Sequence, residues 1–402
     1  MTAMGSVQTE PKILYTSADA DPQGGALRCL FDMGNEIAAW GYGPILAVSE
    51  QLASSPIHVN GSVRTYALRL PRPKRGRSIG SNLYDIVETI RSARRLVKII
   101  RRERISLVHV NEILDVYGGI AAWIARVPCV WHIRADISSW PFPLRALLPR
   151  LVAALSSRII VVSASVQEEV FQLQGVYTPK LTVIHDPGPD PATFSPGVDG
   201  AAVRREFGLG DRAQLVVLVA KLVEPKGHEV LIRAVPSVLA AFPDAHFVIV
   251  GGDLDGAHHQ RYAARQRGLP GQLGVGSAVT FTGYRGDIPQ IMAAADVVTH
   301  CSTHPDPFPG VVLQGMALGK AVIASDIGGP REQIEHGVTG MLVAPGDPVA
   351  LARSICDLLA DPTKRASMGS VAAARVRERF ASDGFYRQLS GAYSVLIGSK
   401  QS

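Results

Sequence analysis

Two lysines near the middle of the chain carry the clearest chemical signal in the sequence. Lys221 and Lys226 lie in the stretch KLVEPKG at 221–227, directly after an apolar run that ends at Ala220. Two ammonium groups in a loop at the carboxyl end of a strand suit a diphosphate, although loop lysines are often only solvated. We predict that this loop binds a diphosphate group.

A second candidate site lies in the segment DPFPGVVLQGMALGK at 306–320, which follows a predicted buried strand at 297–300. Proline and glycine force a tight turn there, and the helix that follows would present free N–H groups at its positive end. Asp306 and Gln314 bracket the turn, and both side chains can bind hydroxyl groups. They can face one ligand only if the helix begins between them.

A pair of glycines opens the first predicted helix. Gly24 and Gly25 follow the predicted strand at 13–15 and would let a ligand reach backbone N–H groups at the positive end of that helix. We expect a phosphate group to bind there. The alternative is that the two glycines only form a tight turn. The complete G-x-G-x-x-G fingerprint of dinucleotide sites and the lysine loop of P-loop proteins are absent from the sequence, so neither class is favoured.

The elements that must position these residues alternate between short apolar runs and helical patterns. Such alternation predicts a parallel sheet covered by helices on both faces. The pattern is interrupted at 186–200, where a proline- and glycine-rich stretch cannot continue a helix or a central strand. The predicted strands are 13–15, 45–48, 107–110, 128–134, 158–163 and 181–184 before this stretch, and 215–220, 247–250, 279–282, 297–300, 321–324 and 341–343 after it.

The pattern therefore predicts an α/β protein with two doubly wound, Rossmann-like domains that face a central cleft. We expect an N-terminal domain at 1–190, a C-terminal domain at 191–380 and a last helix at 381–402 that crosses back to the N-terminal domain. Oxidoreductases, kinases, binding proteins and sugar transferases all use this architecture, so the motifs must decide the function.

Composition narrows the class further. With 402 residues, 47% hydrophobic and 19% charged, the chain is long enough for sizeable cores and too apolar to be disordered. The sequence has no apolar run as long as a membrane span, and its N-terminus lacks the pattern of a signal peptide. Its four cysteines lie far apart without a C-x-x-C pair, which favours a reducing compartment and no zinc site. We therefore expect a cytoplasmic protein.

Five motifs in order resemble those of the retaining nucleotide-sugar glycosyltransferases of the GT-B fold, family 4. They are GGA at 24–26, AKLVEPKG at 220–227, FTGYRGDIPQIMAAADVV at 281–298, DPFPGVVLQGMALGKAVIASDIGG at 306–329 and EHGVTGMLV at 335–343. The resemblance covers nearly the whole chain. It implies that a sugar is transferred from a nucleotide-diphosphate sugar to a hydroxyl of a saccharide or lipid-linked acceptor, with retention of configuration and without a metal or cofactor.

The resemblance also implies roles for individual residues. The groups that match the donor diphosphate site are Gly24, Gly25, Lys221 and Lys226. The groups that match the donor sugar site are Asp306, Phe308, Pro309 and Gly310. Gln314 matches the position that grips the ribose. The family usually has glutamate where Asp306 and Gln314 stand, so the resemblance leaves the sugar preference and the donor affinity open.

A further position implied by the resemblance is a polar residue, commonly a histidine, late on the predicted strand at 128–134. This position falls on Arg134, with His132 two residues earlier, and alternate residues of a strand share a face. We predict that both line the sugar and phosphate site, and a core histidine with a satisfied ring is the alternative for His132. The candidates for acceptor contact at the end of another predicted strand are His109 and Asn111.

No protein nucleophile is expected, because in the family the acceptor hydroxyl attacks the front face of the sugar and the leaving diphosphate helps to accept its proton. The protein then supplies positioning and charge stabilisation. The residues predicted to do so are His132, Arg134, Lys226 and Asp306. Asp19 and Asp21 imitate the D-x-D motif of the other glycosyltransferase fold, and no metal is expected there. The alternatives are a nucleotide-sugar 2-epimerase of the same fold and a non-catalytic sugar-nucleotide binding protein.

The net charge of +6 arises from one region, since residues 64–104 hold 13 Lys and Arg against 3 Asp and Glu. A helix predicted at 81–102 combines cations, which cluster toward Arg91–Arg104, with five apolar residues at helical spacing. The apolar residues are Ile86, Val87, Ile90, Val97 and Ile100. The face could be merely solvated, or it could dock on anionic lipids at the inner face of a membrane. Nucleic acid is not an expected partner, because no aromatic residues interleave with the cations.

Overall fold

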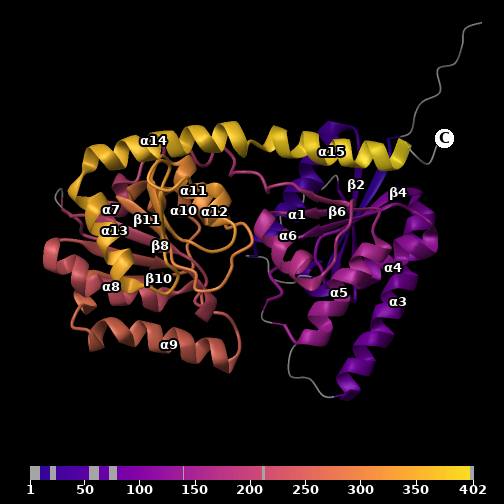
Figure 1. Cartoon of the computed structure of the whole chain (residues 1–402), viewed down its shortest axis with the longest axis horizontal. Coiled ribbons are helices and arrows are strands. Elements are labelled where there is room, and N and C mark those ends of the chain that lie inside the picture. Colours follow the sequence, from indigo (N-terminus) through magenta and orange to yellow (C-terminus); the bar gives the residue numbers. More distant parts are fainter. Residues whose placement is uncertain are drawn as a thin grey trace, which may run out of the picture. The chain divides into compact units, whose positions relative to one another are not determined.

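The computed structural model describes residues 10–18, 24–53, 63–71, 79–138, 140–210 and 213–398. The chain folds into two compact units, shown with the sequence colouring in Figure 1. Unit 1 combines residues 1–186 with 385–402, and unit 2 is formed by residues 187–384. The chain thus passes into unit 2 between Asp186 and Pro187, inside the predicted connection, and the last helix belongs to unit 1 from Phe385 onward.

Unit 1 is built on a parallel sheet of seven strands in the order β3-β2-β1-β4-β5-β6-β7. The direction of winding reverses between β1 and β4, so this is the switch point of the sheet. Its central strands are apolar and buried, as expected for strands covered on both faces. The strands are β1 (Lys12–Ser17), β2 (Gly43–Ser49), β3 (Arg64–Leu68), β4 (Ile105–Val110), β5 (Cys129–Ile133), β6 (Arg158–Val161) and β7 (Leu181–Val183).

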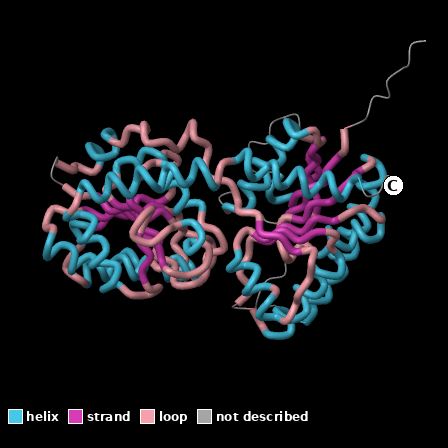
Figure 2. Tube along the Cα trace, turned by 45° about the horizontal axis from the view of Figure 1, so that its top comes forward, coloured by secondary structure: helices cyan, strands magenta, loops and turns pink. Residues whose placement is uncertain are grey.

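Helices flank the strands of unit 1, as the tube in Figure 2 shows. One core joins α1 and the unit 1 part of α15 to the sheet, with Leu30, Tyr15 and Tyr393 wholly buried in it. The helices are α1 (Gly25–Glu36), η1 (Ile37–Trp40), α2 (Glu50–Ala53), α3 (Ile79–Glu103), α4 (Val116–Ala125), α5 (Phe142–Leu155), α6 (Ala164–Val170), η2 (Gln172–Gln174) and α15 (Ser382–Gly398).

Unit 2 repeats the architecture with a parallel six-stranded sheet in the order β10-β9-β8-β11-β12-β13. Its switch point lies between β8 and β11. The strands are β8 (Leu215–Val219), β9 (His246–Val250), β10 (Val279–Gly283), β11 (Val297–His300), β12 (Ala321–Ser325) and β13 (Met341–Val343). The helices are α7 (Ala201–Glu206), η3 (Glu224–Lys226), α8 (His228–Ala241), α9 (Ala257–Gln272), η4 (Gly276–Ala278), α10 (Ile288–Ala294), α11 (Gly310–Ala317), α12 (Pro330–Gln333), α13 (Pro348–Ala360) and α14 (Pro362–Arg379).

The prediction of two doubly wound, Rossmann-like parallel sheets is confirmed. Sequence analysis missed β3, because this edge strand is largely exposed and its charged first residue, Arg64, breaks the apolar pattern. The five apolar residues noted at helical spacing in α3 are divided by the structure, since Val97 and Ile100 are buried whereas Ile86, Val87 and Ile90 are exposed. Within the described ranges, no helix has the length and apolar character that a membrane span requires.

Candidate functional site

The loop after β8 holds the two predicted diphosphate-binding lysines. It contains the short turn η3 and ends at Gly227, which has a φ of 66°. A Cβ at Gly227 would lie 1.9 Å from the carbonyl oxygen of Cys301, so only glycine fits this position. The N–H of Thr303 also donates to the carbonyl of Pro225 at 2.9 Å. The lysine loop is therefore packed against the segment that follows β11.

Four side chains of these two segments form what we call the unit 2 cluster: Lys226, Asp306, His300 and Ser302. The ammonium of Lys226 forms an ion pair with Oδ2 of Asp306. His300, the last residue of β11, places Nε2 3.2 Å from the same oxygen and 3.0 Å from Ser302 Oγ. The exposed fraction falls inward, from 34% for Lys226 through 13% for Asp306 to 5% for His300.

The carboxylate of Asp306 is ionised at neutral pH. Burial alone would raise its pKa, but Lys226 and His300 outweigh burial and hold the pKa well below its usual range. An ionised carboxylate accepts hydrogen bonds only, which suits the hydroxyl groups of a sugar.

The turn predicted after β11 is present, and α11 begins between Asp306 and Gln314 as their joint access to a ligand requires. Pro309 caps the helix and Gly310 opens it. The backbone of Asp306 is fixed, because its carbonyl accepts from the N–H of Gly329 at 2.8 Å. Phe308 is buried, with its ring centroid 5.7 Å from that of Phe380. The start of α11 is thus a rigid feature.

Space is left around this turn. A Cβ placed on Gly310 would have no atom within 4 Å. Gln314, on the second turn of α11, is half-buried, and its side chain forms no hydrogen bond with any residue that the structure describes. Lys221 is likewise partly buried, where β8 ends. Cations and hydroxyl-binding groups are therefore present at the carboxyl ends of β8 and β11.

The glycine pair at the start of α1 lies at the carboxyl end of β1. Gly24 has ordinary extended angles, with φ −73° and ψ 132°, so its conformation does not require glycine. A Cβ on Gly25 would have nothing within 4 Å. Neither observation favours a structural reason for the pair. Asp19 and Asp21, the imitation of a metal motif, lie outside the described residues.

Unit 1 holds a second polar cluster, which we call the unit 1 cluster: His132, Arg134, Asp186, Asn111 and His109. Arg134 grips Asp186 with two nitrogens at 2.8–3.0 Å and donates to Oδ1 of Asn111 at 2.5 Å. His109 Nδ1 lies 2.6 Å from the hydroxyl of Tyr393 on α15. The ring of His132 stacks on Phe385, the first residue of α15 that belongs to unit 1.

The unit 1 cluster is enclosed. His109, Asn111 and His132 are wholly buried, and the side chain of Arg134 is only 4% exposed. Burial lowers the pKa of both histidines well below the ordinary value, and the charge of Arg134 adds to the effect. His132 is buried as a core histidine would be, but neither of its ring nitrogens has a hydrogen-bond partner among the described residues, so burial alone does not decide between a core role and a ligand role. Ligand contact by these four residues stays a prediction, and it requires the cluster to open.

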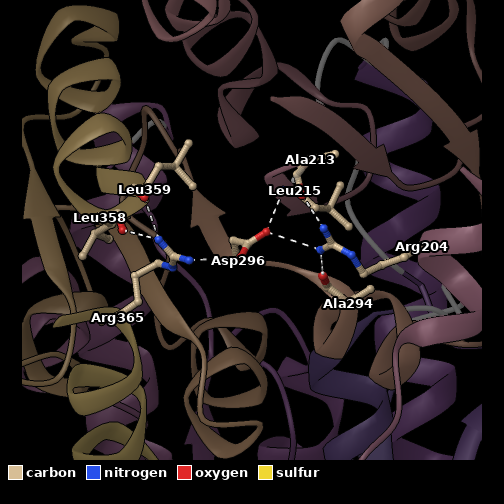
Figure 3. A network of polar contacts seen from close by, with 8 residues as sticks. All are labelled: Arg204, Ala213, Leu215, Ala294, Asp296, Leu358, Leu359 and Arg365. Atoms are coloured by element: carbon tan, nitrogen blue, oxygen red, sulfur yellow. Dashed lines mark hydrogen bonds and ion pairs between the residues drawn. The ribbon is translucent and has the colours of Figure 1, made fainter. Parts of the chain in front are cut away.

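A pocket of about 690 Å³ lies at the opposite, amino-terminal edge of the unit 2 strands. Figure 3 shows its polar wall, where Asp296 accepts from Arg204, Arg365 and the N–H of Leu215. Each arginine also donates to backbone carbonyls, including those of Ala294 and Leu358. The polar groups of this wall are satisfied by one another, which is the pattern of a structural clamp.

Sequence analysis missed His300, Ser302 and Asp186. Asp186 opens the proline-rich connection and gave no chemical signal. His300 had one usable signal, a polar residue closing an apolar strand shortly before Asp306. In the described part of the chain, no group of three or more His, Cys, Asp or Glu side chains is placed to hold a metal ion.

Comparison with known families assigns both units. The model of the glycosyl transferase 4-like domain matches residues 24–187, and that of glycosyl transferases group 1 matches residues 213–361. The chain is 32% identical over 231 residues to the D-inositol 3-phosphate glycosyltransferase of Mycolicibacterium gilvum, which covers 55% of this chain and 49% of that protein. The chain spans about half the length of this relative.

Two further similarities agree. A GDP-mannose-dependent alpha-(1-6)-phosphatidylinositol monomannoside mannosyltransferase of Mycolicibacterium smegmatis is 37% identical over 194 residues, 46% of this chain and 48% of that protein. The crystal structure of Anabaena HepE in complex with UDP-glucose is 27% identical with a TM-score of 0.81, covering 96% of this chain and 99% of that one. One family model on each unit and a structural match along nearly the whole chain show that the protein belongs to the family 4 glycosyltransferases of the GT-B fold.

Proposed function

We propose that this chain is a retaining hexosyltransferase that moves a sugar from a nucleotide-diphosphate sugar to an acceptor hydroxyl without a metal ion. The observation that carries the proposal is the Lys226–Asp306 pair beside the start of α11, at the carboxyl ends of the unit 2 strands. Ligands bind at this edge of doubly wound sheets. The similarity to HepE, which is described in complex with UDP-glucose, supports the choice of donor.

The donor-side residues have complementary tasks. Lys226 and Lys221 would neutralise the diphosphate, with backbone N–H groups at Gly24 and Gly25 as further donors. Asp306 would accept a hydrogen bond from a sugar hydroxyl, and the backbone of Phe308, Pro309 and Gly310 would surround the sugar. Gln314 would bind the ribose. Lys226 must turn from Asp306 to the diphosphate when the donor arrives, which its partly exposed side chain permits.

In the transfer step, the bond between the anomeric carbon and the β-phosphate oxygen breaks, and the acceptor oxygen bonds to the same face of that carbon. The acceptor proton passes to the leaving diphosphate. The lysines stabilise the charge that grows on the diphosphate, which is the largest contribution expected from the protein. Once the unit 1 cluster opens, His132 and Arg134 are proposed to line the sugar and phosphate site, and His109 and Asn111 to contact the acceptor.

The test is an assay of the purified chain with UDP-glucose and GDP-mannose, with and without saccharide and lipid-linked acceptors. We expect nucleoside diphosphate release that depends on an acceptor, is insensitive to EDTA, and gives a product whose anomeric configuration by NMR equals that of the donor. Nucleotide release without an acceptor, together with an altered sugar, would instead identify a 2-epimerase. Binding without turnover would identify a silent binding protein.

The second part of the proposal is that the acceptor is associated with a membrane. The observation behind it is the exposed face of α3. Its solvent face presents Ile86 and Ile90, 58% and 47% exposed, next to a row of exposed cations. The exposed cations are Arg91, Arg94, Arg95, Lys98, Arg101 and Arg102. Aliphatic and basic residues on one exposed helical face are typical of helices that lie on anionic membranes.

This docking is tested with vesicles that contain anionic lipid. We expect binding at low salt and release as ionic strength shortens the Debye length from about 30 Å to about 8 Å. Replacing Arg94, Arg95, Arg101 and Arg102 with Gln should abolish binding. The matched control replaces four exposed arginines of unit 2, Arg233, Arg265, Arg331 and Arg353. Equal losses in both variants would show that only net charge matters, and no binding by the wild type would mean that the basic face is merely solvated.

A further inference from the structure

His300 is a buried histidine that no predicted role explains. It ends β11, where the preceding residues Val297 and Val298 belong to the core. Its Nε2 faces Oδ2 of Asp306 at 3.2 Å and the hydroxyl of Ser302 at 3.0 Å. Its other nitrogen, Nδ1, is buried without a hydrogen-bond partner among the described residues. Its Nε2 therefore has two polar neighbours, the hydroxyl of Ser302 and the carboxylate of Asp306, and only the carboxylate is charged.

The contact with Asp306 favours the form of His300 that carries a proton on Nε2, and the hydroxyl of Ser302 can accept or donate beside it. An ionised carboxylate can only accept, so the contact is favourable when Nε2 donates. The donated hydrogen bond and the ion pair with Lys226 converge on the same oxygen, Oδ2. The second oxygen, Oδ1, has no hydrogen bond within the described part of the chain and lies on a side chain that keeps 13% of its surface exposed. The carboxylate is thereby oriented, with one oxygen held and one left for a ligand.

We propose that His300 is a positioning residue that holds the carboxylate of Asp306 while Lys226 leaves it for the donor diphosphate. The inference rests on the proposed donor site. In the free protein, Lys226 and His300 share Asp306. When the diphosphate draws Lys226 away, the hydrogen bond from His300 keeps Asp306 charged and turned toward the sugar. Without His300, the carboxylate would retain Lys226 as its sole donor and compete with the diphosphate for it.

The first experiment needs no donor. NMR of the histidine side chains in the full chain should show His300 with the proton on Nε2, and Asp306→Asn should shift the Nε2 resonance. A proton on Nδ1, or a resonance that ignores Asp306→Asn, would overturn the inference. This measurement is independent of the proposed function.

The second experiment measures binding of UDP and of GDP by calorimetry, and donor KM and kcat with whichever donor is used. His300→Leu should weaken diphosphate binding and raise KM roughly tenfold, the scale of one hydrogen bond to a charged group. His300→Gln should restore most of the loss, because its amide can donate to Asp306. His246→Gln is the matched control, since His246 is paired with Thr280 at the start of β9.

A double-mutant cycle separates positioning from packing. If His300 acts through the carboxylate, the effect of His300→Leu on binding should largely vanish in the background of Asp306→Asn. Additive losses, or equal losses in the Gln and Leu variants, would show that the residue serves packing only. Failure of the wild type to bind either nucleotide would contradict the proposed function, whereas the NMR result would still decide how His300 holds Asp306.

Discussion

Each unit places a cation, a carboxylate and a histidine at the carboxyl ends of its strands, but the two clusters hold their cations very differently. In unit 1, Arg134 is 4% exposed and binds Asp186 through two nitrogens. In unit 2, Lys226 is 34% exposed and meets Asp306 at a single oxygen. The histidine also differs, since His132 lies 3.9 Å from its carboxylate and His300 lies 3.2 Å from its own.

The difference follows from side-chain chemistry. A planar guanidinium matches a carboxylate with parallel hydrogen bonds, whereas an ammonium is a point charge on a flexible stem. Burial opposes the charge of Arg134, yet Asp186 outweighs burial and raises the pKa of the guanidinium. Asp186 is the last residue of unit 1 before the chain enters unit 2. The Arg134–Asp186 pair therefore fixes the chain at the point where it leaves unit 1. We therefore expect Arg134 to stay paired with Asp186, and Lys226 to leave Asp306 when a ligand binds.

The largest effect on stability should come from breaking the unit 1 cluster. Arg134→Gln leaves Asp186 without its buried partner, which typically costs about 3–5 kcal/mol. Urea unfolding followed by tryptophan fluorescence measures this in unit 1, because all four tryptophans, Trp40, Trp123, Trp131 and Trp140, belong to it. Arg91→Gln is the control in unit 1, because it breaks a pair with Glu88 whose arginine is 56% exposed and should cost about 1 kcal/mol or less. Similar losses in both variants would contradict the anchoring role.

The largest effect on turnover should come from Lys226, the cation that we expect to leave Asp306 for the diphosphate. Lys226→Ala removes charge stabilisation of the leaving diphosphate and should lower kcat/KM roughly 10²–10³-fold. The melting temperature should change little, since the side chain is partly exposed. Lys221→Ala should act in the same direction with an equal or smaller effect, and Lys364→Ala, an exposed lysine on α14, is the control. A folded Lys226 variant with wild-type efficiency would remove the donor-site assignment.

Low pH should destabilise unit 1 through the two buried histidines of the unit 1 cluster. Burial lowers the pKa of His109 and of His132 well below 6.5 in the folded chain. The unfolded chain therefore binds these protons first, so stability is full above about pH 6.5 and is lost as pH falls toward the folded-state pKa values. Each histidine contributes up to about 1.4 kcal/mol of loss per pH unit in that window.

The measurement is urea unfolding of unit 1, by tryptophan fluorescence, at several pH values between about 7 and 5. His132→Phe should flatten the pH dependence, because it removes one titrating group and keeps a ring against Phe385. An unchanged slope in the His132 variant would mean that His132 does not titrate on unfolding.

The fold was largely predictable because the strands of both sheets are short apolar runs separated by helical patterns. The exceptions are local: β3 lies at an edge and carries polar residues, and the first half of α3 exposes aliphatic side chains that resemble a buried stripe. The same periodicity describes a face turned to the core and one turned to solvent. Only the packing of α3 in the structure tells them apart.

The sequence singled out residues that the structure brings together, but not the contacts between them. Lys226 and Asp306 stood out through local turns and motifs, yet they are 80 positions apart and their pairing depends on the neighbouring placement of β8 and β11. Arg134 was predicted to face a ligand because the family resemblance marks its position and strand alternation puts it on the same face as His132. Neither argument shows what covers that face. Asp186, the partner of Arg134, lies 52 positions away in a segment whose composition indicated only a connection.

The smallest expected effect concerns Gln314, which sharpens the description of the unit 2 site. Its half-buried amide on α11 has no described hydrogen-bond partner, which fits a group kept for the ribose. Gln314→Glu should preserve or strengthen donor binding, because a carboxylate accepts two hydroxyl hydrogen bonds and charge-assisted bonds are roughly twice as strong as neutral ones. Gln314→Leu should weaken binding by the equivalent of one neutral hydrogen bond, roughly 0.5–1.5 kcal/mol.

Calorimetric titration of UDP-glucose and GDP-mannose into both variants measures the difference. If Gln314→Leu left both affinities unchanged, Gln314 would not touch the nucleotide. The proposed donor site of unit 2 would then be confined to Lys226, Asp306 and the turn between β11 and α11.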